Sequence, residues 1–229
     1  MKVYAVIVAA GRSERFGGAV PKQFREVCGR PLLSWTISRF EKAASVDKIV
    51  LVVSEDNLLY TFHKVVDPYK YTKLEKIVIG GEKRSQSVIN GLKALPLSTD
   101  IVAIHDGARP LVLPADIDEV VNLAKTRKAA MLAVPATDTI KRVKDGYIIT
   151  TLEREALYYA QTPQVFQYDL IVSAHEHNTM GNHITDDAML VEAMGFMVQV
   201  VVPRSVNIKV TTPEDLIMVE ALLEREIHE

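Results

Sequence analysis

The sequence predicts an α/β fold in which a doubly wound, mostly parallel sheet is covered by helices on both faces. A series of continuous apolar runs rich in β-branched residues is typical of parallel strands that are buried on both sides. Segments with helical periodicity fill the intervals between these runs, so that strands and helices alternate along the chain. This alternation is the pattern of a Rossmann-like sheet, whose strands are joined by crossover helices.

The individual elements can be assigned in chain order. The expected strands are 3–10, 48–54, 77–79, 100–105, 129–134 and 196–202. Apolar residues at 32–40 and at 88–95 form two helical stripes, and Gly91 inside the second stripe indicates close packing. The last helix is expected to start at Thr212-Pro213, because a capping residue, a proline at the first helical position and two acidic residues follow one another there.

The polar segment at 137–164 interrupts this order. Asp145-Gly146 lies between residues of alternating polarity, which predicts a β-hairpin. Because an isolated hairpin is marginally stable in water, we expect this arm to pack on another surface, and a second subunit is the natural candidate. The chain is therefore expected to form a single domain over residues 1–229, with residues 137–164 as a dimerisation β-arm.

Composition excludes several classes of protein. The 229 residues are 48% hydrophobic, which is enough for a full core, and the net charge of -2 provides no basic field for nucleic acid. No apolar run reaches the roughly 18 residues of a membrane helix. The start of the chain lacks a signal-peptide pattern, and the single cysteine, Cys28, excludes an internal disulfide. We expect a cytoplasmic protein with neither a nucleic-acid nor a membrane partner.

The first expected strand leads into a loop between Gly11 and Lys22 that is rich in glycine and basic residues. Glycines let backbone N–H groups approach an anion, and Arg15 and Lys22 add charge and hydrogen-bond donors. The glycine spacing matches neither a P-loop nor a dinucleotide fingerprint. The loop therefore predicts a triphosphate site of another kind, while a plain strand-to-helix loop with incidental basic residues stays open as the alternative.

Further polar groups follow the other strands at their carboxyl ends, where open α/β sheets bind ligands. These groups lie at 80–87, 105–110, 138–141, 185–187 and 207–209. Asp106 is a candidate Mg²⁺ ligand, because Mg²⁺ takes few protein carboxylates and shares the phosphates of its substrate. The alternative for Asp106 is a loop cap. Asp186-Asp187 is compatible with a metal site and equally with a helix N-terminus.

With these residues assembled, the chain resembles the 2-C-methyl-D-erythritol 4-phosphate cytidylyltransferase family of the non-mevalonate isoprenoid pathway. The resemblance covers nearly the whole chain. The motifs that carry it are Ala9-Ala10-Gly11 with Arg15, Pro21-Lys22-Gln23, Gly80-Gly81 with Arg84 and Ser87, His105-Asp106-Gly107-Ala108-Arg109-Pro110, Asp138-Thr139-Ile140-Lys141, Gln161-Thr162-Pro163-Gln164, Thr185-Asp186-Asp187 and Asn207-Ile208-Lys209.

The resemblance implies transfer of a cytidylyl group from CTP to 2-C-methyl-D-erythritol 4-phosphate, with Mg²⁺ or another divalent cation. It implies that Arg15 and Lys22 are catalytic and bind the CTP phosphates. The implied CTP site consists of Val8, Ala9, Ala10, Gly11, Gly81, Glu82, Ser87 and Gly107. The implied acceptor site consists of Asp106, Arg109, Thr139, Arg154, Thr185 and Lys209. Thr139 and Arg154 belong to the arm, and the family's homodimer places them at the acceptor of the neighbouring subunit.

Two other functions stay open. Ribitol 5-phosphate cytidylyltransferases share the fold and much of the acceptor site, although the segments 138–143 and 157–161 look more like the methylerythritol enzymes. A non-catalytic nucleotide-sensing dimer is compatible with the same fold. The presence of both Arg109 and Lys209 argues against the sensor, because a sensor needs no second phosphate site. The family often has an acidic residue where this chain has Val206, so a metal here relies more on Asp106 and the phosphates.

Overall fold

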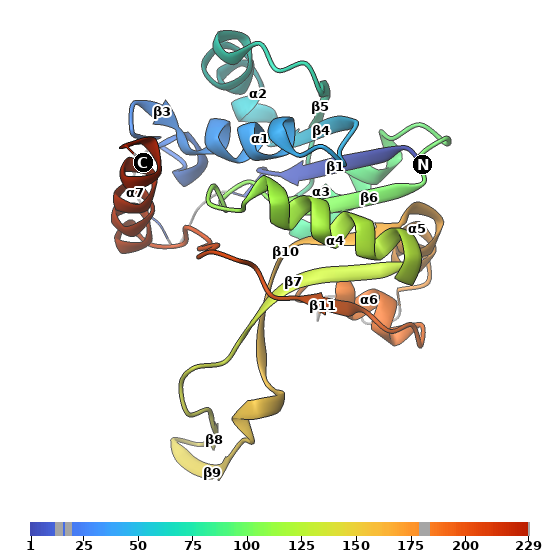
Figure 1. Cartoon of the computed structure of the whole chain (residues 1–229), viewed down its shortest axis with the longest axis vertical. Coiled ribbons are helices and arrows are strands. Elements are labelled where there is room, and N and C mark those ends of the chain that lie inside the picture. Colours follow the sequence, from blue (N-terminus) through green and yellow to red (C-terminus); the bar gives the residue numbers. More distant parts are fainter. Residues whose placement is uncertain (12–15, 17–19, 179–183, 229) are drawn as a thin grey trace.

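The computed structural model describes residues 1–11, 16, 20–178 and 184–228. In this part of the chain, seven strands form the main sheet in the order β11-β7-β10-β6-β1-β4-β5 (Figure 1). Its strands are β1 (Val3–Val8), β4 (Lys48–Val53), β5 (Leu74–Ile79), β6 (Ile101–Asp106), β7 (Ala129–Pro135), β10 (Tyr158–Gln167) and β11 (Gln199–Val201). All neighbouring strands are parallel except for β10, which is antiparallel to both β6 and β7. The predicted mostly parallel α/β fold is confirmed.

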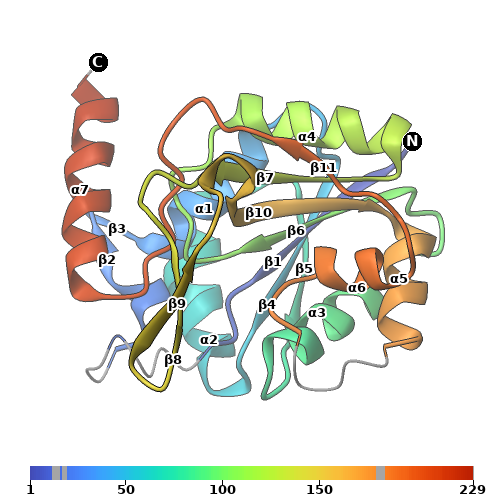
Figure 2. The ribbon, with the colours of Figure 1, turned by 90° about the horizontal axis from the view of Figure 1, so that it is seen from below.

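Helices cover both faces of this sheet, with α4 on one side and α3, α5 and α6 on the other (Figure 2). The helices are α1 (Leu32–Lys42), α2 (Leu58–Tyr60), α3 (Arg84–Lys93), α4 (Pro114–Arg127), α5 (Tyr168–Glu176), α6 (Ala188–Ala193) and α7 (Pro213–His228). Ile7 of β1 belongs to the core formed with α1 and α4, whereas its neighbour Val6 belongs to the core formed with α3, α5 and α6. Successive side chains of a strand point to opposite faces, which is why both cores draw on the same strand.

Most expected elements lie where the sequence predicts them. The strands at 48–54, 77–79, 100–105 and 129–134 correspond to β4, β5, β6 and β7, and α7 begins at Pro213. Gly91 does allow close packing, because a Cβ there would lie 2.5 Å from Val6 Cγ1. The strand expected at 196–202 is shorter than predicted, since β11 covers Gln199–Val201 at the edge of the sheet.

Strand β10 differs most from the expectation. We expected residues up to 164 in the arm, whereas Gln164 pairs with Ile104 of β6 and with Met131 of β7 inside the main sheet. This strand contains the polar segment Gln161-Thr162-Pro163-Gln164, so a search for apolar runs does not detect it. Thr162 and Gln164 are nevertheless buried, because their side chains are hydrogen-bonded within the protein.

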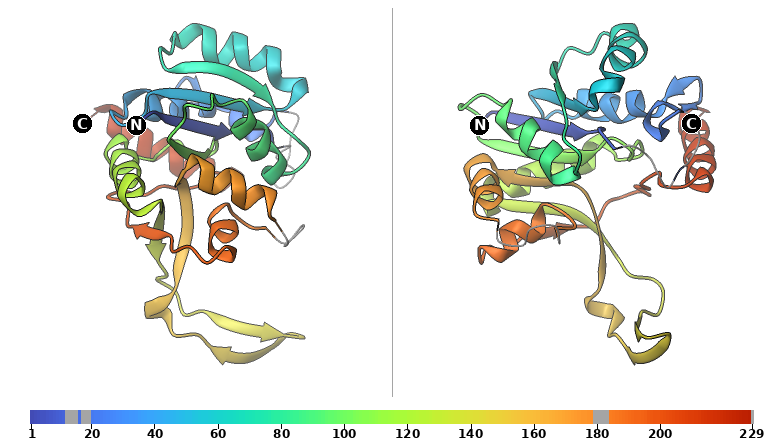
Figure 3. Two further views of the ribbon diagram at one scale, coloured as in Figure 1. Left: turned by 90° about the vertical axis from the view of Figure 1, so that its right-hand side faces the viewer. Right: turned by 180° about the vertical axis from the view of Figure 1, so that it is seen from behind.

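A two-stranded hairpin stands away from the rest of the chain (Figure 3). It consists of β8 (Lys141–Lys144) and β9 (Tyr147–Thr151), which are antiparallel. Asp145 and Gly146 at its tip have φ values of 51° and 82°. A two-residue turn with positive φ at both positions matches the right-handed twist of the strands it joins. The hairpin predicted from Asp145-Gly146 is therefore confirmed as a local structure.

A third apolar cluster lies beside the sheet, where α7 packs against a small hairpin of β2 (Glu26–Val27) and β3 (Arg30–Pro31). Cys28 contributes to this packing and is partly buried. Within the described residues, no helix combines the length and the apolar character that crossing a membrane requires.

Candidate active site

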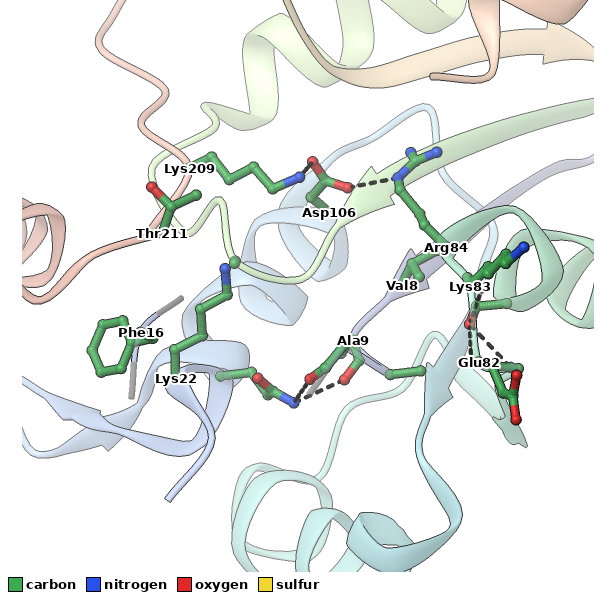
Figure 4. A pocket seen from close by; sticks show the side chains of 16 residues that line it. Val8, Ala9, Phe16, Lys22, Glu82, Lys83, Arg84, Asp106, Lys209 and Thr211 are labelled. Carbon is green, nitrogen blue, oxygen red and sulfur yellow. Dashed lines mark hydrogen bonds and ion pairs between the residues drawn. The ribbon is translucent and has the colours of Figure 1, made fainter. Parts of the chain in front are cut away.

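A pocket of about 360 Å³ opens where β1, β5 and β6 end. Parallel strands bring the loops that follow them to the same edge of the sheet, so residues far apart in sequence meet there (Figure 4). The described lining residues are Val8, Ala9, Ala10, Gly11, Phe16, Lys22, Gln23, Gly81, Glu82, Lys83, Arg84, Ser87, Asp106, Ala108, Lys209 and Thr211.

The loop after β1 is held in place by Gln23. This side chain is buried, and its Nε2 donates hydrogen bonds to the carbonyl oxygens of Ala9 (3.0 Å) and Gly11 (3.2 Å). Gln23 belongs to a short 3₁₀ helix, Lys22–Phe24, which also brings Lys22 into the wall of the pocket. Figure 4 shows Lys22 extending into the space that Lys209 borders from the other side. Lys22 thereby contributes a cation to the pocket wall.

The loop after β5 approaches the end of β1 closely. A Cβ on Gly80 would lie 2.5 Å from Ala10 Cβ, so a larger residue at this position would push the two loops apart. Ser87, from the first turn of α3, accepts a hydrogen bond from the backbone N–H of Gly81 at 3.1 Å. Ser87 thus shapes the loop that carries Gly81 and the exposed Glu82 into the pocket wall.

Asp106, the last residue of β6, is surrounded by three cations. Its Oδ2 lies 2.8 Å from Lys209 Nζ and 3.5 Å from Arg109 Nε, and its Oδ1 lies 3.2 Å from Arg84 Nε. A second carboxylate, that of Asp187, lies 2.8 Å from Arg84 Nη1. The three cations and two carboxylates together carry one net positive charge, which favours the binding of a phosphate group.

The ionisation of Asp106 follows from these neighbours. Burial alone raises the pKa of a carboxyl group, and the Asp106 side chain is only 10% exposed. Arg84, Lys209 and Arg109 outweigh burial and hold the pKa of Asp106 well below its usual value. Asp106 therefore remains a carboxylate and cannot act as a general acid at neutral pH.

His105 supports Asp106 from inside the protein. Thr162 Oγ1 accepts a hydrogen bond from the backbone N–H of Asp106 at 3.1 Å. The same oxygen lies 3.0 Å from His105 Nδ1, to which the hydroxyl group can donate a hydrogen bond. His105 Nε2 then donates to the carbonyl oxygen of Arg109 at 3.1 Å. Burial lowers the pKa of His105 to about 3, so the ring is neutral and the network assigns the proton to Nε2. His105 is a structural support, not a general base.

Comparison with known proteins identifies the family to which this geometry belongs. The sequence matches the family described as IspD, 2-C-methyl-D-erythritol 4-phosphate cytidylyltransferase, over residues 3–225. The chain belongs to this family. The enzyme of that name from Geobacter metallireducens is 40% identical over 231 residues, which cover 99% of this chain and 100% of the relative. The one from Desulforamulus reducens is 44% identical over 225 residues, covering 97% and 96%.

Solved structures of the family also resemble this fold. A 4-diphosphocytidyl-2C-methyl-D-erythritol synthase from Anaerococcus prevotii superposes with a TM-score of 0.84 at 32% identity, covering 97% of this chain and 98% of the other. The 2-C-methyl-D-erythritol 4-phosphate cytidylyltransferase from Thermus thermophilus has a TM-score of 0.78 at 32% identity, covering 98% and 100%. The predicted membership in the cytidylyltransferase family is confirmed.

The pocket brings together most of the residues that the family resemblance implies for CTP. Val8, Ala9, Ala10, Gly11, Gly81, Glu82, Ser87 and Lys22 all line it. Gly107 does not line the pocket itself, although its neighbours Asp106 and Ala108 do. A Cβ on Gly107 would lie 2.9 Å from Ala9 Cβ and 3.0 Å from Leu33 Cδ1, so the site is tightly packed at this point. Arg15 lies outside the described residues.

The implied acceptor residues are distributed over a wider area. Asp106 and Lys209 line the pocket, and Arg109 lies behind them, with its Nη1 donating to the carbonyl oxygen of Asn207 at 2.7 Å. Thr185 is not a lining residue, and its hydroxyl lies 3.7 Å from Met189 Sδ.

Thr139 and Arg154 belong to the arm and not to this pocket. Arg154 is exposed, and its Nη1 donates a hydrogen bond to the carbonyl oxygen of Thr137 at 2.7 Å. Thr139 is exposed as well. Neither of them is among the described residues that line the pocket.

Sequence reasoning assigned no individual role to six of the lining residues: Phe16, Gln23, Lys83, Arg84, Ala108 and Thr211. Arg84 and Gln23 lie within motifs that the sequence analysis singled out, but their partners are distant in sequence. The carboxylate of Asp106 lies 22 residues from Arg84 along the chain, and that of Asp187 lies 103 residues from it. No local pattern reports such pairings.

The described pocket residues do not form a cage for a metal ion. Asp106 and Glu82 are the carboxylates among them, and Asp106 is already engaged by three cations. Asp186 Oδ1 accepts the N–H of Met189 at 3.0 Å and so caps α6, and Asp187 is paired with Arg84. The described group with metal-ligand spacing, Cys28 with Glu220 and Glu224, is not part of the pocket.

Proposed function

We propose that this protein transfers the cytidylyl group of CTP to 2-C-methyl-D-erythritol 4-phosphate, with release of pyrophosphate. The observation that carries the proposal is the arrangement of Lys22 and Lys209 on opposite sides of a single pocket, with Asp106 between Lys209 and Arg84. A reaction between two anions needs cations on both reactants, and this pocket provides them from different elements. Family membership supports the choice of CTP and of the methylerythritol phosphate.

In the reaction, an oxygen of the acceptor phosphate attacks the α-phosphorus of CTP in line with the leaving group. The new P–O bond forms as the bond to the β-phosphate oxygen breaks, and pyrophosphate departs with that electron pair. A phosphate monoester is already largely ionised at neutral pH, so no strong general base is required. The neutral, buried His105 is consistent with this, since the step does not need it. The protein contributes position and positive charge.

We assign the CTP side of the pocket as follows. Lys22 stabilises the charge that develops at the α-phosphorus, and Arg15 of the same loop shares this role. The backbone at Ala9, Ala10, Gly11, Gly81 and Glu82, together with Ser87, binds the cytosine. Val8 and Gly107 lie against the ribose. Tight packing of the loops after β1, β5 and β6 supports this assignment, because it lets backbone groups of these loops approach a bound ligand.

The acceptor side is assigned to Asp106, Arg109, Lys209 and Thr185. The net positive charge around Asp106 favours the phosphate group of the acceptor, and Asp106 itself accepts hydrogen bonds from hydroxyl groups. We further propose that the protein is a homodimer, in which the arm supplies Thr139 and Arg154 to the acceptor site of the other subunit. The exposed apolar side chains of β9 support an interface there.

A divalent cation is assigned to the triphosphate and not to a cage of protein ligands. Mg²⁺ commonly keeps several waters and is bound by one or two carboxylates together with phosphates of the substrate. Asp106 is the buried carboxylate of the described pocket residues, and it is already neutralised by its neighbours. A divalent cation would enter with CTP and neutralise phosphate charge there, and Asp106 is the buried carboxylate that would help to hold it.

The proposal is tested by measuring pyrophosphate release with CTP and Mg²⁺, with 2-C-methyl-D-erythritol 4-phosphate and ribitol 5-phosphate offered in parallel. We expect turnover of the first acceptor. Turnover of ribitol phosphate alone would support cytidylyl transfer but refute methylerythritol phosphate as the acceptor. Silence with both acceptors, despite CTP binding measured by calorimetry, would favour a nucleotide sensor over an enzyme.

A further inference from the structure

Asp187 is a buried carboxylate to which the proposed function assigns no role. It is fully buried, at 0% exposure, and it does not line the pocket. Its Oδ2 lies 2.8 Å from Arg84 Nη1, and its Oδ1 lies 3.4 Å from His175 Nε2. Burial raises the pKa of this carboxyl group, but Arg84 and His175 outweigh burial, and the net effect lowers the pKa. A charge is thus kept in the protein interior next to the pocket.

Helix α6 does not need the Asp187 carboxylate, although Asp187 stands at its N-cap. The Asp187 side chain makes no capping hydrogen bond to the helix. Asp186 does so instead, through the N–H of Met189. Gln164 Oε1 accepts the backbone N–H groups of Asp187 (3.0 Å) and Ala188 (2.9 Å). Because the first N–H groups of the helix are satisfied by Asp186 and Gln164, the charge of Asp187 has Arg84 as its main partner.

Arg84 connects this buried charge to the pocket. It is the first residue of α3, its Nη1 lies 2.8 Å from Asp187 Oδ2, and its Nε lies 3.2 Å from Asp106 Oδ1. A guanidinium group is planar and rigid, so fixing one nitrogen on one carboxylate determines where the others point. Asp187 lies farther from the pocket and Asp106 lines it, which makes Arg84 the link between them.

We propose that Asp187 is a positioning residue for cytidylyl transfer. It holds Arg84 against Asp106, and Arg84 in turn keeps the Asp106 carboxylate in the orientation that also places Lys209 for the acceptor phosphate. The inference rests on the proposed function, which assigns Asp106 and Lys209 to the acceptor.

The chain offers a matched pair of substitutions to test this role, Asp187→Asn and Asp186→Asn. Both remove a carboxylate from the start of α6, but only Asp187 contacts Arg84. We expect Asp187→Asn to lower kcat/KM for the acceptor by about tenfold or more, the loss typical of a hydrogen bond between charged groups. Asp186→Asn should stay within about threefold of the wild type, and both variants should keep the calorimetric Kd for CTP within about threefold.

A double-mutant cycle separates positioning from a merely structural role. If Asp187 acts through Arg84, then Asp187→Asn should cost less than about twofold when it is added to Arg84→Met, because the link is already broken. Multiplicative losses in the double variant would overturn the proposal. Equal losses of activity and of thermal stability in Asp186→Asn and Asp187→Asn would also overturn it, since they would reflect damage to α6.

A readout that does not depend on turnover distinguishes this proposal from the function on which it rests. The side-chain Nε–H of Arg84 can be followed by NMR in protein labelled with ¹⁵N-arginine, with Arg84→Lys used for assignment. We expect a slowly exchanging signal in the wild type and in Asp186→Asn, and its loss in Asp187→Asn. An unchanged signal in all three proteins would refute the positioning role. An inactive wild type with the expected NMR pattern would instead refute the proposed acceptor chemistry.

Discussion

The pocket and the β8–β9 hairpin differ in how far their side chains are enclosed by the chain itself. In the pocket, the charge of Asp106 is compensated within the same chain by Arg84, Lys209 and Arg109. On the hairpin, Tyr147 is 76% exposed and Ile148 is 64% exposed, and both lie on β9. Burying an aliphatic side chain of this size stabilises a protein by roughly 1.5–3 kcal/mol. Asp106 is thus compensated by cations of its own chain, whereas the arm leaves its apolar side chains exposed.

Strand β10 connects these two regions. It starts at Tyr158, next to the arm, and ends at Gln167 in the main sheet. Along it, exposed Tyr158 and Tyr159 give way to buried Thr162 and Gln164. The Thr162 side chain accepts a hydrogen bond from the backbone N–H of Asp106, and the Gln164 side chain accepts one from the backbone N–H of Asp187. Strand β10 therefore leads from the proposed interface at the arm to the residues that hold Asp106 and Asp187. Substitutions in the arm and in the pocket test these two regions separately.

The largest effect is expected at the arm, from Ile148→Asp. In a symmetric dimer the substitution acts in both subunits, so two buried isoleucines would be lost, worth about 3–6 kcal/mol in total. We expect the dissociation constant of the dimer to rise by more than about hundredfold, and the acceptor turnover to fall with it. Sedimentation equilibrium measures the assembly. Leu97→Asp, at a residue that is 95% exposed outside the arm, should have no effect. If the wild-type protein is monomeric, the proposed dimer interface at the arm is refuted.

The next largest effect is expected inside the pocket, from Lys22→Ala. Removing a group that stabilises transition-state charge typically lowers kcat by about 10²–10³-fold. Pyrophosphate release under saturating CTP provides the measurement, and circular dichroism should show an unchanged fold. Lys93→Ala, on the exposed end of α3, removes the same charge away from the pocket and should retain full turnover. Similar turnover in the two variants would contradict the role of Lys22.

A smaller effect is expected from Arg39→Met, which tests how the body of the protein is held together. Arg39 is 4% exposed and binds Glu226 of α7 through Nη1 and Nη2, at 2.5 and 2.6 Å, and the carbonyl oxygen of Pro110 through Nε. Because Glu226 is half exposed and can be rehydrated, we expect a loss of about 2 kcal/mol in the free energy of unfolding, measured in urea.

The exposed ion pair of Lys70 with Asp67 serves as the control for Arg39. Lys70→Met should leave the free energy of unfolding close to that of the wild type, because exposed pairs contribute little. Equal losses in Arg39→Met and Lys70→Met would show that burial of the Arg39 pair is unimportant.

The effect of His105 on stability depends on pH and is, per pH unit, smaller than the loss expected in Arg39→Met. The pKa of His105 is about 3 in the folded protein, and an unfolded histidine has a pKa of about 6.5. Between these values the unfolded state binds the additional proton, so stability falls as the pH is lowered from about 6.5 towards 3. This single group accounts for at most about 1.4 kcal/mol per pH unit. Urea unfolding at several pH values should show a shallower dependence in His105→Asn, and parallel curves would refute the assignment.

The sequence predicted the central strands, the hairpin turn and the start of α7 because each leaves a local pattern. The β-branched runs mark β1, β4 and β6, Asp145-Gly146 marks the turn, and Thr212-Pro213 marks the helix start. It also placed Lys22, Gly81 and Asp106 at strand ends, which parallel topology brings to one edge. The place of β10 escaped prediction, since its polar residues are buried through hydrogen bonds that no local pattern contains.

By itself, then, the sequence determined which segments become strands, which loops carry the charges and to which family the chain belongs, because periodicity and motif spacing are properties of neighbouring residues. Only the tertiary structure decided that Arg84 lies between Asp106 and Asp187, that Gln164 holds the start of α6, and that β9 presents its apolar side chains outward. These arrangements depend on distances between residues far apart in the chain, and such distances exist only once the sheet has brought the strand ends together.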